Sequence, residues 1–283
     1  MFRRGGRVRA LRPGSLDVAL DHALTDPLTN ALAGARLREA ARSTPVLQEF
    51  SQAGDETRPD GVLWHGVNVS PLSATGSALG EFGRHLASRS RRASSVVGDR
   101  AAVEALWQSL SSTWGDDVRE YRWSQPLLVA DDLADLPELA PVPLRPAVAG
   151  EEALVFPAAV AMFREEVGID PLQGDGGRSY RARVEELIRN RRTYVVIEDG
   201  QVQFKADVGA LFGPVAQIHG VWVRPEGRGK GLGGAAMAQL ARQVQRDHAP
   251  QVSLYVNDFN EPARRAYAAA GFRQVGELTT ILF

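Results

Sequence analysis

The sequence predicts an α/β (α+β) protein of two domains, each with a mixed, mostly antiparallel sheet flanked by helices. Three observations predict this class. The second half of the chain alternates strand and helix patterns after a hairpin signal, both halves open on the same short motif, and a segment rich in proline separates them. At 283 residues, the chain is long enough for each half to bury its own core.

The domain boundary is predicted within residues 131–143. An acidic run and three prolines interrupt every periodicity there, which is typical of a semi-stiff linker. This places an N-terminal domain at residues 1–135 and a C-terminal domain at residues 142–283.

The two halves share an opening. Residues 8–13 and 142–146 are both short strand-like runs that end in Arg-Pro, and Leu11 and Leu144 stand 133 positions apart. That spacing is near the size of a small α/β domain. We interpret the match as a trace of internal duplication, with coincidence as the alternative.

The elements of the second half are predicted from periodicity. Apolar residues recur on one side of residues 153–167 and 180–189, which indicates two amphipathic helices. A β-branched strand at 193–197 leads through Asp199-Gly200, a strong hairpin signal, into a strand at 201–209. The remaining elements are a strand at 216–223, a helix at 234–246, a strand at 252–256, a helix at 262–270 and a closing strand at 278–283.

The first half gives fewer signals. Residues 61–69 predict one long strand or a strand pair, Ser77 is the expected N-cap of the next helix, and Asp99 caps another. That last helix carries an apolar stripe typical of a core: Val103, Leu106, Trp107 and Leu110. Only Gly76 and Gly80 stand where a repeat would place a phosphate loop. This half is therefore a degenerate copy of the second, or an unrelated α/β module that senses a ligand or binds a partner.

Composition excludes several classes of function. The net charge of -1 gives no reason to expect a nucleic-acid or membrane partner, and the lack of cysteine excludes disulfides and thiolate chemistry. The five histidines have no ligand spacing, so we expect no metal. The first six residues are basic but no apolar run follows them, which predicts a cytoplasmic protein.

The most informative segment is the glycine-rich run at residues 228–234, Arg-Gly-Lys-Gly-Leu-Gly-Gly, which follows a strand and opens a helix. Successive backbone N–H groups in such a turn point into one concavity, and the helix N-terminus adds its positive dipole end. Glycine lets the backbone approach a phosphate closely. Arg228 and Lys230 add positive charge, so the run is suited to a diphosphate.

Two other types of phosphate-binding loop share features with this run. A Walker A loop needs Ser or Thr after its lysine, and Gly231 follows Lys230. The dinucleotide fingerprint fits the spacing of residues 229–234, but it normally opens a βαβ unit, whereas this strand comes late, after a hairpin. A loop without any ligand is the third alternative, and the backbone entropy that so many glycines cost argues against it.

Three motifs in order carry a resemblance to a known family. Arg228-x-x-Gly231-x-Gly233 follows a strand that ends in Val-Trp-Val, residues 253–257 read Ser-Leu-Tyr-Val-Asn, and residues 260–267 precede Gly-Phe. Residues 142–283 thereby resemble acetyl-coenzyme A N-acetyltransferases of the GNAT superfamily. The whole chain resembles two-part actinobacterial proteins with an uncharacterised N-terminal domain, so the implied fold is two GNAT-like domains in tandem, the first degenerate.

The resemblance implies acetyl-CoA as the acyl donor and a set of binding residues. That set is Val221, Trp222, Val223, Arg228, Gly229, Lys230, Gly231, Leu232, Gly233, Gly234, Asn260 and Tyr267. Asn260 would hydrogen-bond the pantetheine arm and Tyr267 would face the thioester sulfur. Their seven-residue spacing puts both on one helix face, about 20° apart.

The implied reaction is direct attack of a neutral amine on the thioester. A backbone N–H within residues 220–223 would donate to the oxyanion, and Tyr267, with a free pKa of about 10, would act as general acid. The general base is open among His219, Asp207, Glu165 and Glu166.

The predicted function is an N-acetyltransferase. The alternative is a non-catalytic acyl-CoA-binding regulatory protein, and a third reading is a nicotinamide-dependent oxidoreductase. The expected partners are an amine substrate, of small-molecule, aminoglycoside, peptide or protein-lysine type, and at most a second copy of the chain in a homodimer.

Overall fold

The computed structural model describes residues 8–132 and 138–283, which form two compact units. The first unit holds the described residues up to Leu127, with Tyr255–Asp258 and Gln274–Phe283; the second holds the described residues of Leu128–Leu254 and Phe259–Arg273. The basic N-terminal run and residues 133–137 of the predicted linker lie outside the described residues.

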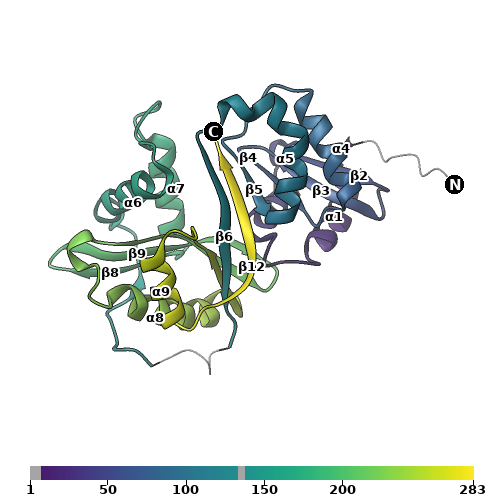
Figure 1. Ribbon diagram of the computed structural model, residues 1–283. Helices are drawn as coiled ribbons and strands as arrows, with labels where there is room; N and C mark the ends of the chain where they lie inside the picture. Colours follow the sequence, from purple (N-terminus) through teal and green to yellow (C-terminus); the bar gives the residue numbers. More distant parts are fainter. Residues whose placement is uncertain (1–7, 133–137) are drawn as a thin grey trace. The chain divides into compact units, whose positions relative to one another are not determined.

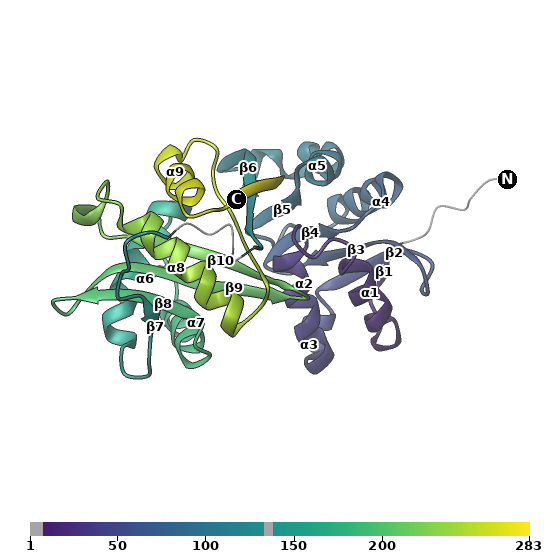
Figure 2. The same cartoon turned by 90° about the horizontal axis from the view of Figure 1, so that it is seen from below.

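The first unit consists of a sheet that is covered by helices on both faces. Its elements are β1 (Arg9–Ala10), α1 (Leu16–Ala23), α2 (Ala31–Glu39), α3 (Thr44–Leu47), β2 (Phe50–Gly54), β3 (Pro59–His65), β4 (Asn68–Leu72), α4 (Gly76–Ala87), β5 (Ser95–Asp99), α5 (Arg100–Trp114) and β6 (Glu120–Ala130). The strand order is β1-β2-β3-β4-β5-β12-β6. β4 and β5 run parallel, whereas β1 with β2, β2 with β3, β3 with β4, and β5 with β12 run antiparallel. Figure 2 shows α4 and α5 on one side of these strands and α1 to α3 on the other.

Two of the three local predictions for the first half are confirmed and one is wrong. Residues 61–69 form a strand pair, β3 and β4, and Asp99 caps α5 by accepting the N–H of Ala102 at 2.9 Å. The expectation that Ser77 caps α4 is wrong. Thr75 has the extended backbone of an N-cap and accepts the N–H of Ala78 at 3.4 Å, because the helix begins two residues before the position assumed.

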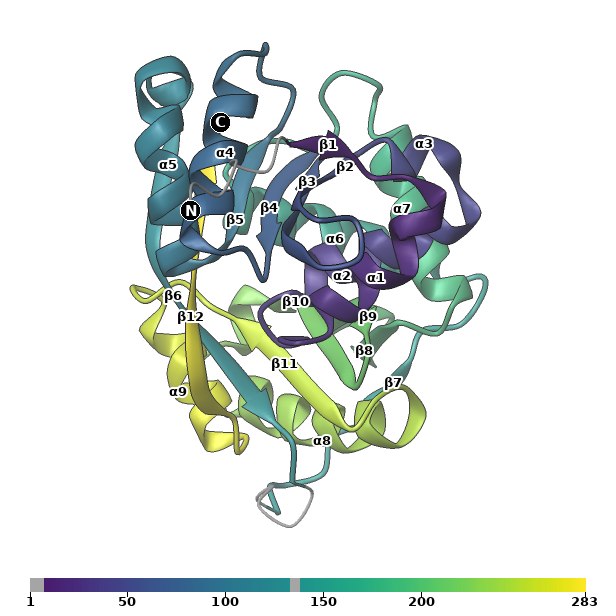
Figure 3. The ribbon, with the colours of Figure 1, turned by 90° about the vertical axis from the view of Figure 1, so that its right-hand side faces the viewer.

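The last strand, β12 (Arg273–Leu282), was expected to close the sheet of the second domain. It pairs antiparallel with β5 instead, with Thr280 opposite Val97, so it belongs to the first unit apart from Arg273. Ile281 is fully buried in that unit's core, and Thr279 donates to the carbonyl of Trp123 at 2.6 Å. Figure 3 shows β12 running beside β6.

The second unit contains every helix and strand predicted from periodicity in this half except that closing strand. Its elements are β7 (Arg145–Pro146), α6 (Glu152–Val167), α7 (Arg178–Arg189), β8 (Thr193–Glu198), β9 (Gln201–Phe212), β10 (Val215–Val223), α8 (Leu232–Asp247), β11 (Gln251–Tyr255) and α9 (Glu261–Ala269). The strand order is β11-β10-β9-β8-β7, antiparallel except for β10 with β11. Figure 1 shows α6 and α7 on one face and α8 on the other.

The predicted fold class is confirmed: both units are mixed, mostly antiparallel sheets flanked by helices. The hairpin turn is where Asp199-Gly200 indicated it, and both residues have positive φ, 50° and 69°. Within the described residues, no helix is long and apolar enough to cross a membrane.

Candidate functional site

The middle of β10 is the irregular point of the second sheet. Its parallel pairing with β11 covers only residues 215–217, although β10 continues to Val223. On its other edge the pairing with β9 shifts, so that Gly220 and Val221 together oppose the single residue Ala206. A bulge of this kind disrupts the ladder locally. The sheet therefore opens beside β10, on the strand that leads to the glycine-rich run.

The glycine-rich run forms the turn between β10 and α8. Gly229 and Gly231 adopt positive φ, 74° and 86°, and Gly231 is the N-cap of α8. A Cβ atom at either position would have no atom within 4 Å. Backbone conformation, and not packing, is what requires glycine there.

The backbone N–H groups of residues 229–234 point to no acceptor within the described chain. The flanking amides are used: Arg228 donates to the carbonyl of Pro225 at 3.2 Å and Ala235 to that of Gly231 at 3.1 Å. Six consecutive donors at a helix N-terminus are thus unpaired within the part of the chain that the structure describes. Such a set is an anion-binding concavity, so the residues fit the diphosphate of coenzyme A.

Gly233 and Gly234 have a different role in the same run. A Cβ at Gly233 would stand 3.4 Å from Val223, and one at Gly234 would stand 3.5 Å from the carbonyl oxygen of Ala266. These glycines allow α8 to pack closely on β10 and α9, which lies beside it in Figure 1. The run thus combines two loop-shaping and two packing glycines.

Arg228 is held by a carboxylate of the same unit. Its Nε donates to the carbonyl of Val223 at 2.9 Å, and its Nη2 pairs with Glu165 of α6 at 2.7 Å. Glu165 also accepts the indole N–H of Trp222 at 3.2 Å. No described carboxylate forms an ion pair with Lys230. A hollow of about 440 Å³ borders Glu165 and Trp222.

Helix α9 presents Asn260 and Tyr267. Asn260 caps the helix, since its Oδ1 accepts the N–H of Ala263 at 3.3 Å. Tyr267 is buried and its ring lies 6.1 Å from that of Phe272, centroid to centroid. No described residue hydrogen-bonds its hydroxyl. Burial, with a smaller contribution from Glu166, raises the pKa of Tyr267, so the phenol holds its proton at neutral pH.

The candidate bases have partners of their own. Burial lowers the pKa of His219 to about 4, and its Nε2 lies 2.8 Å from Oε1 of Gln217. Asp207 pairs with Lys205 and accepts the hydroxyl of Thr193 at 2.7 Å. His219 is therefore neutral at pH 7, and Asp207 is held in an ion pair.

Lys205 and Asp207 are the site residues that sequence reasoning missed as a pair. They belong to the alternating run Gln-Val-Gln-Phe-Lys-Ala-Asp-Val, and alternation of this kind is typical of a strand with one face toward solvent. α6 covers that face, and Lys205 is only 1% exposed. The signal that could have found the pair is the choice of lysine at a strand position in a chain that otherwise uses arginine.

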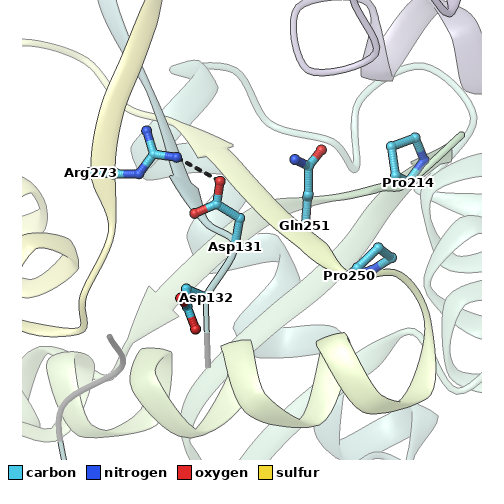
Figure 4. Close-up of a pocket in the computed structure, with 6 residues that line it drawn as sticks. All are labelled: Asp131, Asp132, Pro214, Pro250, Gln251 and Arg273. Carbon is cyan, nitrogen blue, oxygen red and sulfur yellow. Dashed lines mark hydrogen bonds and ion pairs between the residues drawn. The ribbon is translucent and has the colours of Figure 1, made fainter. Parts of the chain in front are cut away.

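A second hollow, of about 560 Å³, lies apart from the glycine-rich run (Figure 4). Two of the residues that line it form an ion pair: Nη2 of Arg273 donates to Oδ2 of Asp131 at 2.6 Å. Gln251 also lines the hollow. None of the predicted binding residues lines it.

The corresponding turn of the first unit, after β4, is filled by its own side chains. The hydroxyl of Ser73 accepts from Nδ2 of Asn30 at 2.9 Å and lies 3.0 Å from that of Thr25, and its carbonyl lies 3.0 Å from Nε2 of His22. No run of glycines stands there, which agrees with a degenerate copy.

Comparison with known proteins identifies the class. Residues 162–272 match the model of the acetyltransferase (GNAT) family, and residues 49–151 match a domain of unknown function, DUF4081. A segment similar to GNAT-family acetyltransferases therefore follows a segment similar to DUF4081. No curated protein sequence matches it.

Solved structures of similar fold span the whole chain. An acetyltransferase of the GNAT family from Colwellia psychrerythraea superposes with a TM-score of 0.60 at 12% identity, covering 98% of this chain and 99% of that one. A GCN5-related N-acetyltransferase from Sphaerobacter thermophilus gives 0.61 at 16% identity, with 97% and 94% covered. A tandem GNAT protein from the clavulanic acid biosynthesis pathway gives 0.55 at 17% identity, with 97% and 98% covered. Two GNAT-like domains in tandem are thus the fold of this chain, and that fold supports acyl transfer in general.

Proposed function

We propose that the second unit binds acetyl-CoA and transfers its acetyl group to an amine. The observation that supports this most directly is the row of six N–H donors at residues 229–234, with Lys230 beside them. A diphosphate satisfies such a row, and the open space at Gly229 and Gly231 allows its close approach.

The proposed reaction is a direct acyl transfer in which Tyr267 acts as the acid. Acetyl-CoA would supply an activated acyl thioester, and the amine nitrogen would form the new C–N bond as the C–S bond breaks. The proton of Tyr267 passes to the leaving sulfur, and the amine loses its own proton to the base or to water. Because burial raises the pKa of Tyr267, the phenol is protonated at neutral pH, so Tyr267 can act as an acid and not as a base.

Titration calorimetry with coenzyme A and acetyl-CoA tests the binding site. Gly231→Glu would put a carboxylate among the N–H donors and should abolish binding of both ligands. Gly150→Glu is the matched control, since Gly150 also has positive φ, 96°, and open space around it. Equal affinity in the wild type and in Gly231→Glu would refute the site. Binding of NADH in preference to coenzyme A would favour an oxidoreductase.

Release of free thiol over a panel of amines separates an enzyme from a regulatory binding protein. We expect acetyl-CoA and one class of amine to give turnover, and Tyr267→Phe to lower kcat about 100-fold with little change in donor affinity. Binding without turnover for every amine would favour the regulatory alternative.

A further inference from the structure

A buried ion pair lies directly behind the bulge of β10. Lys205 is 1% exposed and its ammonium pairs with the carboxylate of Asp207, two residues along β9. The other carboxylate oxygen of Asp207 accepts from Thr193, which is fully buried. These three side chains form a polar triad on the face of the sheet that α6 covers, where His219 of β10 lies opposite Asp207.

The fold itself gives little reason for a charged pair at this place. Removing two charges from water is costly, and apolar residues of similar size are often at least as stabilising. The chain has only two lysines, Lys205 and Lys230, among its 33 basic residues of Lys and Arg type. A compact ammonium fits where a planar guanidinium does not. The triad is therefore a candidate for a role beyond stability.

The triad contacts the backbone at Gly220. Nζ of Lys205 donates to the carbonyl oxygen of Gly220 at 3.3 Å. A Cβ atom at Gly220 would lie 2.8 Å from Met162, 3.3 Å from Nζ of Lys205 and 3.4 Å from Oδ2 of Asp207. Gly220 also has a positive φ of 57°. The positive φ and these close side chains both favour glycine at the point where the ion pair reaches the peptide.

The bond to Lys205 sets the direction of the next amide. No described peptide bond is cis, and a trans peptide is planar, with its C=O and N–H pointing in opposite directions. Since the carbonyl of Gly220 faces Lys205, the N–H of Val221 points away from it. Both residues lie in the bulge, where the regular ladder does not fix the peptide plane.

We infer that Lys205 and Asp207 are positioning residues: they fix the Gly220–Val221 peptide so that the N–H of Val221 donates to the thioester oxygen as it becomes negative. The inference rests on the proposed function. Asp207 holds the ammonium, the ammonium holds the carbonyl, and the amide is oriented before substrate arrives. Donors fixed in advance need no reorganisation during the reaction, which is why they are effective. The amide of Val221 keeps its proton throughout. The C–N bond forms as the C–S bond breaks, the sulfur takes the proton of Tyr267, and the amine nitrogen loses one proton to the base or to water.

Two variants separate positioning from stability. Lys205→Met leaves the carboxylate of Asp207 buried without its cation, so it should be destabilised and could fail to fold. The triple variant Thr193→Val/Lys205→Met/Asp207→Leu removes all three polar groups and should keep a melting temperature near that of the wild type. Tyr194→Phe is the control, because it removes a buried hydroxyl that bonds to His248 on the other face of the sheet from Thr193 and Asp207.

The variants are compared by two readouts. The first is the amide signal of Val221 in unliganded protein labelled with ¹⁵N-valine, assigned by its loss in Val221→Ile. The second is kcat with the KM for acetyl-CoA. In the triple variant we expect a shifted or broadened Val221 signal and a loss of about 100-fold in kcat at little changed KM. In Tyr194→Phe, both readouts should match the wild type.

A stable triple variant with wild-type kcat and an unmoved Val221 signal would overturn the inference, since the triad would then be structural only. A moved signal with unchanged kcat would overturn it too, because the amide would not be the donor. Wild-type protein that binds coenzyme A without turnover would refute the proposed function, and the catalytic role falls with it. The signal in unliganded protein would still report whether the triad orients the peptide, so the two failures can be told apart.

Discussion

Among the single side chains of the second unit, Glu165 bears most directly on the proposed acetyl-CoA site. Its carboxylate forms an ion pair with the guanidinium of Arg228. Both side chains are 47% exposed, and a pair of that exposure contributes little to stability. A diphosphate that approaches residues 229–234 would compete with Glu165 for Arg228. The residue that supports the loop in the unliganded protein therefore opposes ligand binding.

Glu165→Gln should raise the affinity for coenzyme A about two- to fivefold, because the competing charge is removed while the melting temperature stays within about a degree. Calorimetric titration and thermal unfolding measure the two effects. Glu186→Gln is the matched control, since it breaks the comparably exposed pair with Arg183 on α7. A weaker affinity in Glu165→Gln would show that Glu165 orients Arg228 for binding instead of competing for it.

His219 gives the second unit a pH-dependent stability. Burial lowers its pKa to about 4, whereas an exposed histidine titrates near 6.5. Between those values the unfolded chain binds a proton that the folded chain does not, so stability falls as pH drops from about 6.5 to 4. The full effect is about 3 kcal/mol at most.

The measurement is the difference in unfolding free energy between wild type and His219→Gln from pH 8 to pH 4. We expect that difference to move by up to about 3 kcal/mol in favour of the variant as pH falls, since groups common to both proteins cancel. Parallel curves would mean that His219 is solvated enough to titrate normally.

At the scale of elements, α9 is a short helix whose N-cap is also a proposed ligand contact. The Oδ1 atom of Asn260 caps the helix, which leaves its NH₂ group as the part available to a pantetheine carbonyl. The cap and the donor thus belong to different atoms of one side chain.

Two substitutions distinguish these roles. Asn260→Ala should cost about 1 kcal/mol of stability through the lost cap, whereas Asn260→Ser should keep most of the cap. Both lack the amide donor, so both should weaken acetyl-CoA binding by a similar factor. Chemical denaturation and titration give the two quantities; wild-type affinity in Asn260→Ser would limit Asn260 to capping.

At the scale of the whole molecule, the two units do not divide the chain at one point. The final strand, β12, completes the first unit, and Ile281 near the C-terminus is fully buried in a core built otherwise from residues of the first half. The core of the first unit therefore includes residues from β12, far along the chain from its other members.

Ile281→Ala should destabilise the first unit by about 2–5 kcal/mol through the cavity it leaves. Hydrogen exchange should rise in β5 and α5, while α6 and β9 stay protected. Ile188→Ala, in the core of the second unit, is the reciprocal control and should expose α6 and α7. If Ile281→Ala raised exchange equally in both units, they would unfold as a single cooperative body.

The sequence by itself determined the helices and strands of the second unit, because their apolar positions recur with clear periods and Asp199-Gly200 and Gly231 mark their turns. It also predicts an anion-binding chemistry for the loop at residues 228–234, since local backbone freedom and charge govern that chemistry. The binding residues of the loop and of α9 remain predictions.

Only the tertiary structure decided which sheet β12 joins and which polar groups are buried. An isolated strand carries no information about its partner, because any exposed edge offers the same hydrogen bonds. Lys205 and Asp207 look solvated in an alternating pattern and are buried only because α6 covers that face. Long-range packing decides both cases, and neither can be calculated from neighbours in the sequence.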